Sequence, residues 1–95
     1  MRMRNSKDLK PMEKTLKALA NRRRLAILEF LKKAKEAPVG DIAEEINLSF
    51  KATSKHLSIL LAADIVEKEQ RSLQMWYSIS SGVQSAAAKA ILYLL

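Results

Sequence analysis

Apolar residues recur at helical spacing along most of the chain. Where the spacing i, i+3, i+4, i+7 is kept, it predicts helices over residues 12–20, 22–34, 39–47, 49–62 and about 82–95. Pro11 is expected at or near the start of the first helix, where its missing N–H costs nothing. The helix over residues 22–34 is apolar at most positions, so it is expected to be the central helix of the core.

The apolar period shortens towards two after Asp64. Residues 65–70 and 74–79 carry β-branched and aromatic side chains in partial alternation, so they predict two strands that form a hairpin. Before them, residues 35–38 only break the helical pattern, because Pro38 biases its predecessor away from helix.

The predicted element order is α-α-α-α-β-β-α. This order describes a mainly α fold with a small β-hairpin, a winged helix-turn-helix. The helix-turn-helix is expected over about residues 39–63 and the wing over about 65–79, although the turn lacks the usual glycine.

Residues 48–62 predict a helix with two different faces. Ser49 is suited to be its N-cap. One face carries Lys51, Ser54, Lys55 and Ser58, the other is largely apolar, and no acid occurs between Glu45 and Asp64. Such a helix fits a DNA major groove. On this stretch alone, an ordinary amphipathic surface helix is an equally good interpretation.

Charge favours a polyanionic partner. The 95 residues carry a net charge of +7, and residues 1–24 hold nine Lys or Arg against two acids. A balance this basic favours nucleic acid, and the alternative is a basic protein with a charged tail. Residues 1–10 are expected to be a flexible basic arm and residues 11–95 a single winged-helix domain.

Several classes of function are disfavoured by the residue inventory. The chain has no cysteine and one histidine, so thiolate catalysis, disulfides and multi-ligand metal sites have no residues to use. No apolar segment follows the basic N-terminus, and residues 86–95 are too short to span a bilayer. We therefore expect a cytoplasmic protein that is not an enzyme and has no membrane segment, cofactor or metal.

Four segments together resemble the ArsR-type winged-helix repressors. They are residues 16–28 (LKALANRRRLAIL), 39–49 (VGDIAEEINLS), 54–60 (SKHLSIL), and the pair Asp64–Val66 and Tyr77–Ile79 that brackets the wing. The resemblance covers about two thirds of the chain. It implies a homodimer that binds a palindromic operator in double-stranded DNA, with the recognition helix in the major groove and the wing over the neighbouring backbone or minor groove.

The resemblance also implies the residues that contact DNA. Phe50 could touch a thymine methyl group or pack the helix start onto the core, and we favour the second. Arg24 is expected to be structural, and His56 to bridge core and backbone. The predicted DNA-binding residues are Ser49, Phe50, Lys51, Ala52, Ser54, Lys55, Ser58, Arg71 at the wing tip, and Arg22 and Arg23 at the start of the second helix.

The chain departs from the family at its sensing sites. Residues 36–42 lack the cysteine pair that many members use for metal, and residues 81–95 lack the His and acidic ligands of others. We therefore expect a repressor with a different effector or none. A winged helix used to bind protein or RNA remains the alternative function.

The first and last helices are the expected dimer surface. The end of the chain is apolar nearly all round, and packing inside the monomer is the alternative for it. The predicted interface residues are Met12, Leu16, Leu19, Val83, Ala87, Ala90, Ile91, Leu94 and Leu95.

Overall fold

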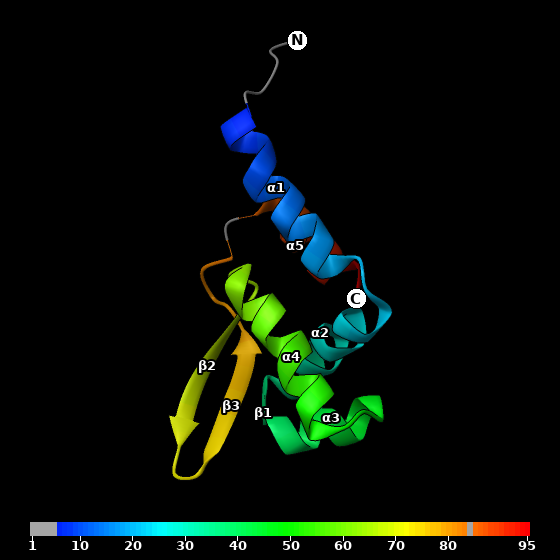
Figure 1. Ribbon diagram of the computed structural model, residues 1–95, viewed down its shortest axis with the longest axis vertical. Coiled ribbons are helices and arrows are strands. Elements are labelled where there is room, and N and C mark those ends of the chain that lie inside the picture. Colours follow the sequence, from blue (N-terminus) through cyan, green and yellow to red (C-terminus); the bar gives the residue numbers. More distant parts are fainter. Residues whose placement is uncertain (1–5, 84) are drawn as a thin grey trace.

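A computed structural model describes residues 6–83 and 85–95 (Figure 1). Five helices and three strands follow one another in the order α1, α2, β1, α3, α4, β2, β3, α5. Their bounds are α1 Ser6–Leu19, α2 Arg22–Ala34, β1 Glu36–Pro38, α3 Val39–Ile46, α4 Phe50–Ala62, β2 Val66–Arg71, β3 Gln74–Ile79 and α5 Ala86–Leu94. The mainly α winged helix-turn-helix predicted from the sequence is confirmed, with one additional strand.

Helix α2 is the centre of the core, as its apolar pattern predicts. Ile27, Leu28 and Leu31 are buried on it, and buried side chains of α3, α4 and β2 pack around them. Asn21 caps the helix, and its Oδ1 accepts from the backbone N–H groups of Arg23 and Arg24 at 3.0 and 3.2 Å.

The sheet has three antiparallel strands in the order β1-β3-β2. The short strand β1 was not predicted, because Pro38 was interpreted only as a break. An X-Pro step is also extended, and Ala37 pairs with Tyr77 of β3. The hairpin turns at Ser72 and Leu73, and Ser72 takes a positive φ of 57° in place of a turn glycine.

The start of α1 differs from the prediction. The helix begins at Ser6, so residues 6–10 are helical rather than part of a flexible arm, and Pro11 lies inside the helix. A proline at this depth costs the helix one backbone hydrogen bond. The remaining part of the predicted arm, residues 1–5, lies outside the described residues.

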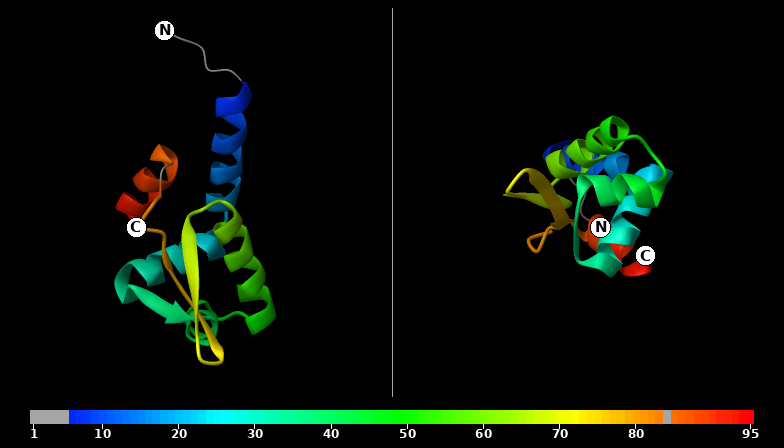
Figure 2. Two further views of the ribbon diagram at one scale, coloured as in Figure 1. Left: turned by 90° about the vertical axis from the view of Figure 1, so that its left-hand side faces the viewer. Right: turned by 90° about the horizontal axis from the view of Figure 1, so that it is seen from below.

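Helix α5 starts later than predicted, at Ala86, where Ser85 caps it by accepting from the backbone N–H of Ala88 at 3.2 Å. Helices α1 and α5 pack together at one end of the molecule, and the wing and α4 extend from the other (Figures 1 and 2). Among the described residues, none of the helices has the length and apolar character needed to cross a membrane.

Candidate nucleic-acid interface

The turn between α3 and α4 is tightly held without glycine. Asn47 ends α3 in the left-handed conformation, with φ 56° and ψ 50°, which asparagine tolerates better than most residues. The N–H of Leu48 donates to the Ala43 carbonyl at 3.0 Å. Ser49 then caps α4, and its Oγ accepts from the N–H of Ala52 at 3.1 Å. These bonds fix the angle at which α4 leaves α3.

Helix α4 has the two faces that its sequence predicts. Thr53, Leu57 and Leu60 are fully buried against the core. The Thr53 hydroxyl donates to the Ser49 carbonyl at 2.8 Å, which satisfies this buried polar group. Lys51, Lys55 and Ser58 are exposed and Ser54 is half-buried. The helix therefore presents polar side chains from Lys51 to Ser58 while its other side anchors it.

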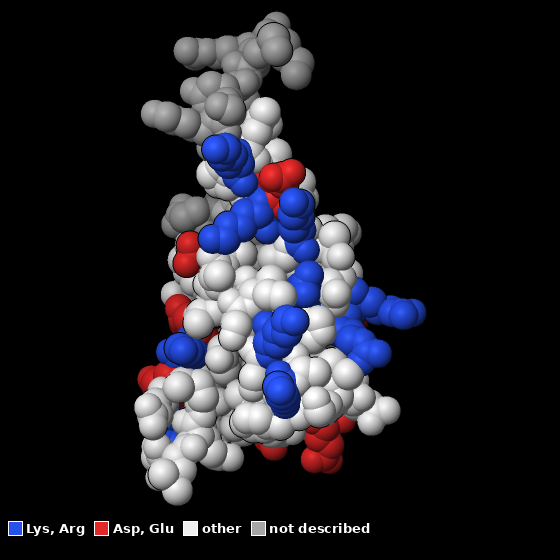
Figure 3. Space-filling model, in the orientation of Figure 1, with Lys and Arg blue, Asp and Glu red and all other residues white. Residues whose placement is uncertain are grey.

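The charge around this surface is positive. In Figure 3, Lys and Arg side chains run down the visible face over α1 and α4, while acidic side chains lie mainly at its edges. No residue in the first turn of α4 is acidic, so the partial positive charge of the helix N-terminus is not compensated locally.

Phe50 corrects one prediction. Its side chain is 63% exposed, so it does not pack the start of α4 onto the core. The reason is its place at the first position of the helix, beyond the edge of the core that buries Leu57 two turns later. Phe50 is instead an exposed aromatic ring beside Lys51.

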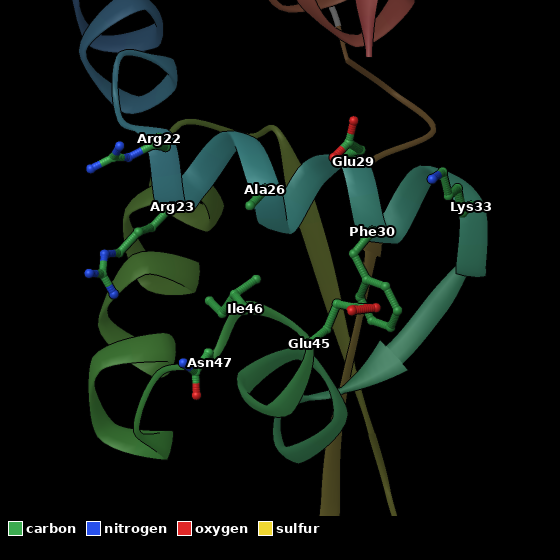
Figure 4. Close-up of a pocket in the computed structure, with 9 residues that line it drawn as sticks. All are labelled: Arg22, Arg23, Ala26, Glu29, Phe30, Lys33, Glu45, Ile46 and Asn47. Carbon is green, nitrogen blue, oxygen red and sulfur yellow. The ribbon is translucent and has the colours of Figure 1, made fainter.

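Arg22 and Arg23 are exposed at the start of α2, as predicted. They stand at one edge of a groove of about 560 Å³ between α2 and α3 (Figure 4). Ala26, Phe30 and Ile46 point into this groove, whereas the two arginines project outward from the helix end. Their charges therefore face solvent on the flank of the helix-turn-helix.

Arg24 is a structural residue that connects three helices. Its guanidinium donates to the carbonyls of Ala18 at 2.6 Å and Lys17 at 3.2 Å, at the end of α1, where a helix leaves carbonyls without intrahelical donors. Its Nη1 also lies 3.1 Å from Nδ1 of His56 on α4. Burial, followed by the positive charges of Arg24, Arg23 and Lys55, lowers the pKa of His56. The lowered pKa favours the neutral ring, whose Nδ1 can accept from Arg24.

Arg71, predicted as a DNA contact at the wing tip, is ion-paired within the protein. Two of its nitrogens donate to the two carboxylate oxygens of Glu36 at 2.7 Å each, and its Nε donates to Glu69 at 2.5 Å. The guanidinium also lies over the ring of Trp76, 4.8 Å from its centroid. These bonds raise the pKa of Arg71 and lower that of Glu36. The prediction missed them because Glu36 comes from the unpredicted strand β1.

The predicted dimer residues divide into two groups. Leu16, Ala90 and Leu94 are exposed, and Met12, Ala87, Ile91 and Leu95 are half-buried. Leu19 and Val83 are buried in the core of the monomer, so their assignment to the dimer surface is wrong. They lie beneath that surface. Tyr93, part of the predicted apolar end of the chain, is exposed on α5, and the exposed Leu9, which was not predicted, extends the apolar surface on α1.

Across residues 9–83 and 85–95, no three His, Cys, Asp or Glu side chains come together in a way that could hold a metal ion.

Helices α3 and α4, followed by the β2–β3 hairpin, define a winged helix-turn-helix, a fold that binds DNA through its second helix. Residues 21–68 match the family described as bacterial regulatory protein, arsR family. The chain belongs to this family, which makes it a transcriptional regulator rather than an enzyme.

Three curated relatives match the chain, and two of them are named as transcriptional regulators. The chain is 42% identical over 66 residues to the nodulation protein NolR of Rhizobium meliloti, which covers 70% of this chain and 53% of NolR. It is 33% identical over 72 residues to the transcriptional repressor SdpR of Bacillus subtilis. This match covers 76% of this chain and 79% of SdpR. It is 36% identical over 81 residues to the transcriptional activator HlyU of Vibrio cholerae. This match covers 78% of this chain and 74% of HlyU. The chain thus spans about half the length of NolR and about three quarters of the other two.

The fold is also that of a solved relative. The homodimeric winged helix-turn-helix DNA-binding domain of Mb0332 from Mycobacterium bovis superposes with a TM-score of 0.82 at 26% identity, covering 99% of this chain and 83% of that one.

Proposed function

We propose that this protein is a dimeric, sequence-specific repressor of transcription that places α4 in the major groove of a palindromic operator. The exposed surface of α4 carries the proposal. Lys51 and Lys55 are free of acidic neighbours on the helix, and the turn before it is fixed by the bonds of Asn47 and Ser49. A helix held in this way can present side chains to base edges.

The contacts divide by chemistry. Lys51, Ser54 and Lys55 project where base edges would lie, and Lys and Ser can donate to bases or phosphates. Phe50 and Ala52 supply apolar surface at the start of the helix. Ser49, Ser58, Arg22 and Arg23 flank this row and are assigned to the phosphate backbone, which supplies affinity without sequence information.

The dimer is proposed from the apolar surface on α1 and α5. Leu94 is 76% exposed on α5, next to the exposed Tyr93, and Leu9 and Leu16 are exposed on α1, which packs against α5. Exposed large apolar side chains that gather on one surface mark an interface. The homodimeric state of the Mb0332 domain supports this assignment. A two-fold dimer would present two copies of α4 to two half-sites.

The sign of regulation is proposed as repression, by analogy with the SdpR repressor. HlyU, an activator, offers the opposite example. A reporter gene placed behind the bound sequence decides between them: we expect lower expression with the protein present, and higher expression would contradict repression.

Selection of bound duplexes from a random DNA pool tests the proposal. We expect a palindrome whose half-sites are about one helical turn apart, because the second helix of each protomer reads one half-site. The Lys51→Ala variant should enrich the same palindrome poorly. If no sequence is enriched, the proposed specificity is wrong. If a single unsymmetrical site is enriched, the proposed dimeric reading is wrong.

A further inference from the structure

Six large apolar side chains are exposed in the part of the chain that the structure describes. Four of them, on α1 and α5, belong to the proposed dimer surface. The other two are Phe50 at the start of α4 and Leu73 at the tip of the wing, both at the opposite end of the molecule (Figure 1). The dimer therefore does not account for Phe50.

The start of α4 is held without Phe50. A hydrophobic staple joins the residue before the N-cap to the fourth residue of the helix. With Ser49 as N-cap, these positions are Leu48, which is half-buried, and Thr53, which is buried. Phe50 occupies the first helical position, and its ring is free to meet a partner.

The chemistry of a phenyl ring limits what it can recognise in a major groove. The groove presents hydrogen-bond donors and acceptors from all four bases, and one apolar group, the 5-methyl of thymine. The first residues of a recognition helix are those that reach base edges. Phe50 also lies one turn before Ser54, on the same side of the helix.

We propose that Phe50 contacts the 5-methyl group of a thymine in each half-site and makes that thymine a determinant of specificity. The assignment rests on the proposed function, since it requires α4 in the major groove. Lys51, the next residue, attracts any phosphate or guanine edge, so it adds affinity more than discrimination. Phe50 adds discrimination, because uracil and cytosine lack the methyl group.

Replacing each thymine of the selected duplex by uracil, one position at a time, tests the proposal, because this removes only the methyl group. One thymine per half-site should be sensitive. Burial of one CH₂-sized group is worth about 0.8 kcal/mol, so affinity should fall about fourfold per half-site. Phe50→Ala should bind the thymine and uracil duplexes equally, and Phe50→Leu should keep part of the difference.

Leu73→Ala is the matched control. Leu73 is 98% exposed, so this variant also removes an exposed apolar side chain, but from the wing. It should keep the full sensitivity to uracil. Thermal melting of Phe50→Ala should match that of the unaltered chain, because the lost ring is mostly in solvent.

The outcomes separate the two proposals. If the unaltered chain binds the selected duplex but tolerates uracil at every position, Phe50 does not read thymine, and the proposed function stands. The same conclusion follows if Phe50→Ala keeps the sensitivity, or if the selected half-site contains no thymine. If selection enriches no duplex at all, the proposed function itself fails.

Discussion

Replacing both carboxylates that hold Arg71 should strengthen DNA binding through the wing. In the unaltered chain, Glu36 and Glu69 accept three hydrogen bonds from this guanidinium at 2.5–2.7 Å. Its charge is therefore compensated within the protein. Glutamine keeps the size of each side chain but removes the negative charge, so in the Glu36→Gln/Glu69→Gln variant the guanidinium can turn to a phosphate, its other preferred partner.

The magnitude follows from counterion release. Each added phosphate contact steepens the dependence of log Kobs on log salt concentration by about 0.9. A dimer has two wings, so the slope should steepen by about 1.8. The ratio of affinities at about 50 and 200 mM salt should therefore grow roughly tenfold. Fluorescence anisotropy with the selected duplex, over this range of salt, measures both quantities.

The control must change net charge equally and leave Arg71 alone. Glu13→Gln/Glu29→Gln removes two exposed carboxylates from α1 and α2. It should change the slope much less than the wing variant does. Equal slopes for the two double variants would refute the reasoning, because they would show that releasing Arg71 creates no new phosphate contact.

Three further predictions test the support of the site. Arg24→Ala should destabilise the fold by about 2 kcal/mol, because it leaves the last carbonyls of α1 without donors. Tm should therefore fall by roughly 10 °C, and an unchanged Tm would contradict the structural role of Arg24. The lowered pKa of His56 means that the unfolded chain binds its proton more tightly than the folded one. The free energy of unfolding, from denaturant titration, should therefore decrease as pH falls below about 6.5, and His56→Gln should weaken that dependence; an equal dependence in both chains would contradict it. Leu94→Glu should yield a folded monomer in sedimentation, because the Leu94 side chain is mostly in solvent in the monomer. Leu16→Glu should also yield a folded monomer. Dimers that persist in both variants would contradict the proposed interface.

Local patterns in the sequence were sufficient to predict most of the fold. The two faces of α4 follow from helical spacing within 13 residues, and Leu57 and Leu60 are buried where the period places them. Strand β1 could not be found in this way. It is three residues long, and its pairing partner Tyr77 lies 40 positions later in the chain.

The errors at the candidate site also come from long-range packing. Arg71 was predicted as a DNA contact without its ion pair, because its partner Glu36 lies 35 residues away in sequence. Of the two roles left open for Phe50, packing the start of α4 onto the core was favoured, but the core ends before the first turn of this helix. Val83 was assigned to the dimer surface because its pattern continues that of α5, yet it precedes the helix and enters the monomer core.

The central claim is that α4 is the DNA-reading element, and a comparison of two variants of equal charge tests it most directly. Lys51→Ala/Lys55→Ala removes two lysines from the exposed face of α4. Lys33→Ala/Lys35→Ala removes two exposed lysines, one in the last turn of α2 and one at its C-cap, and this end of α2 lies away from α4 (Figure 2). We predict that the first variant binds the selected duplex at least about tenfold more weakly than the unaltered chain, and the second nearly as well. Equal affinities for the two variants would contradict the assignment of α4.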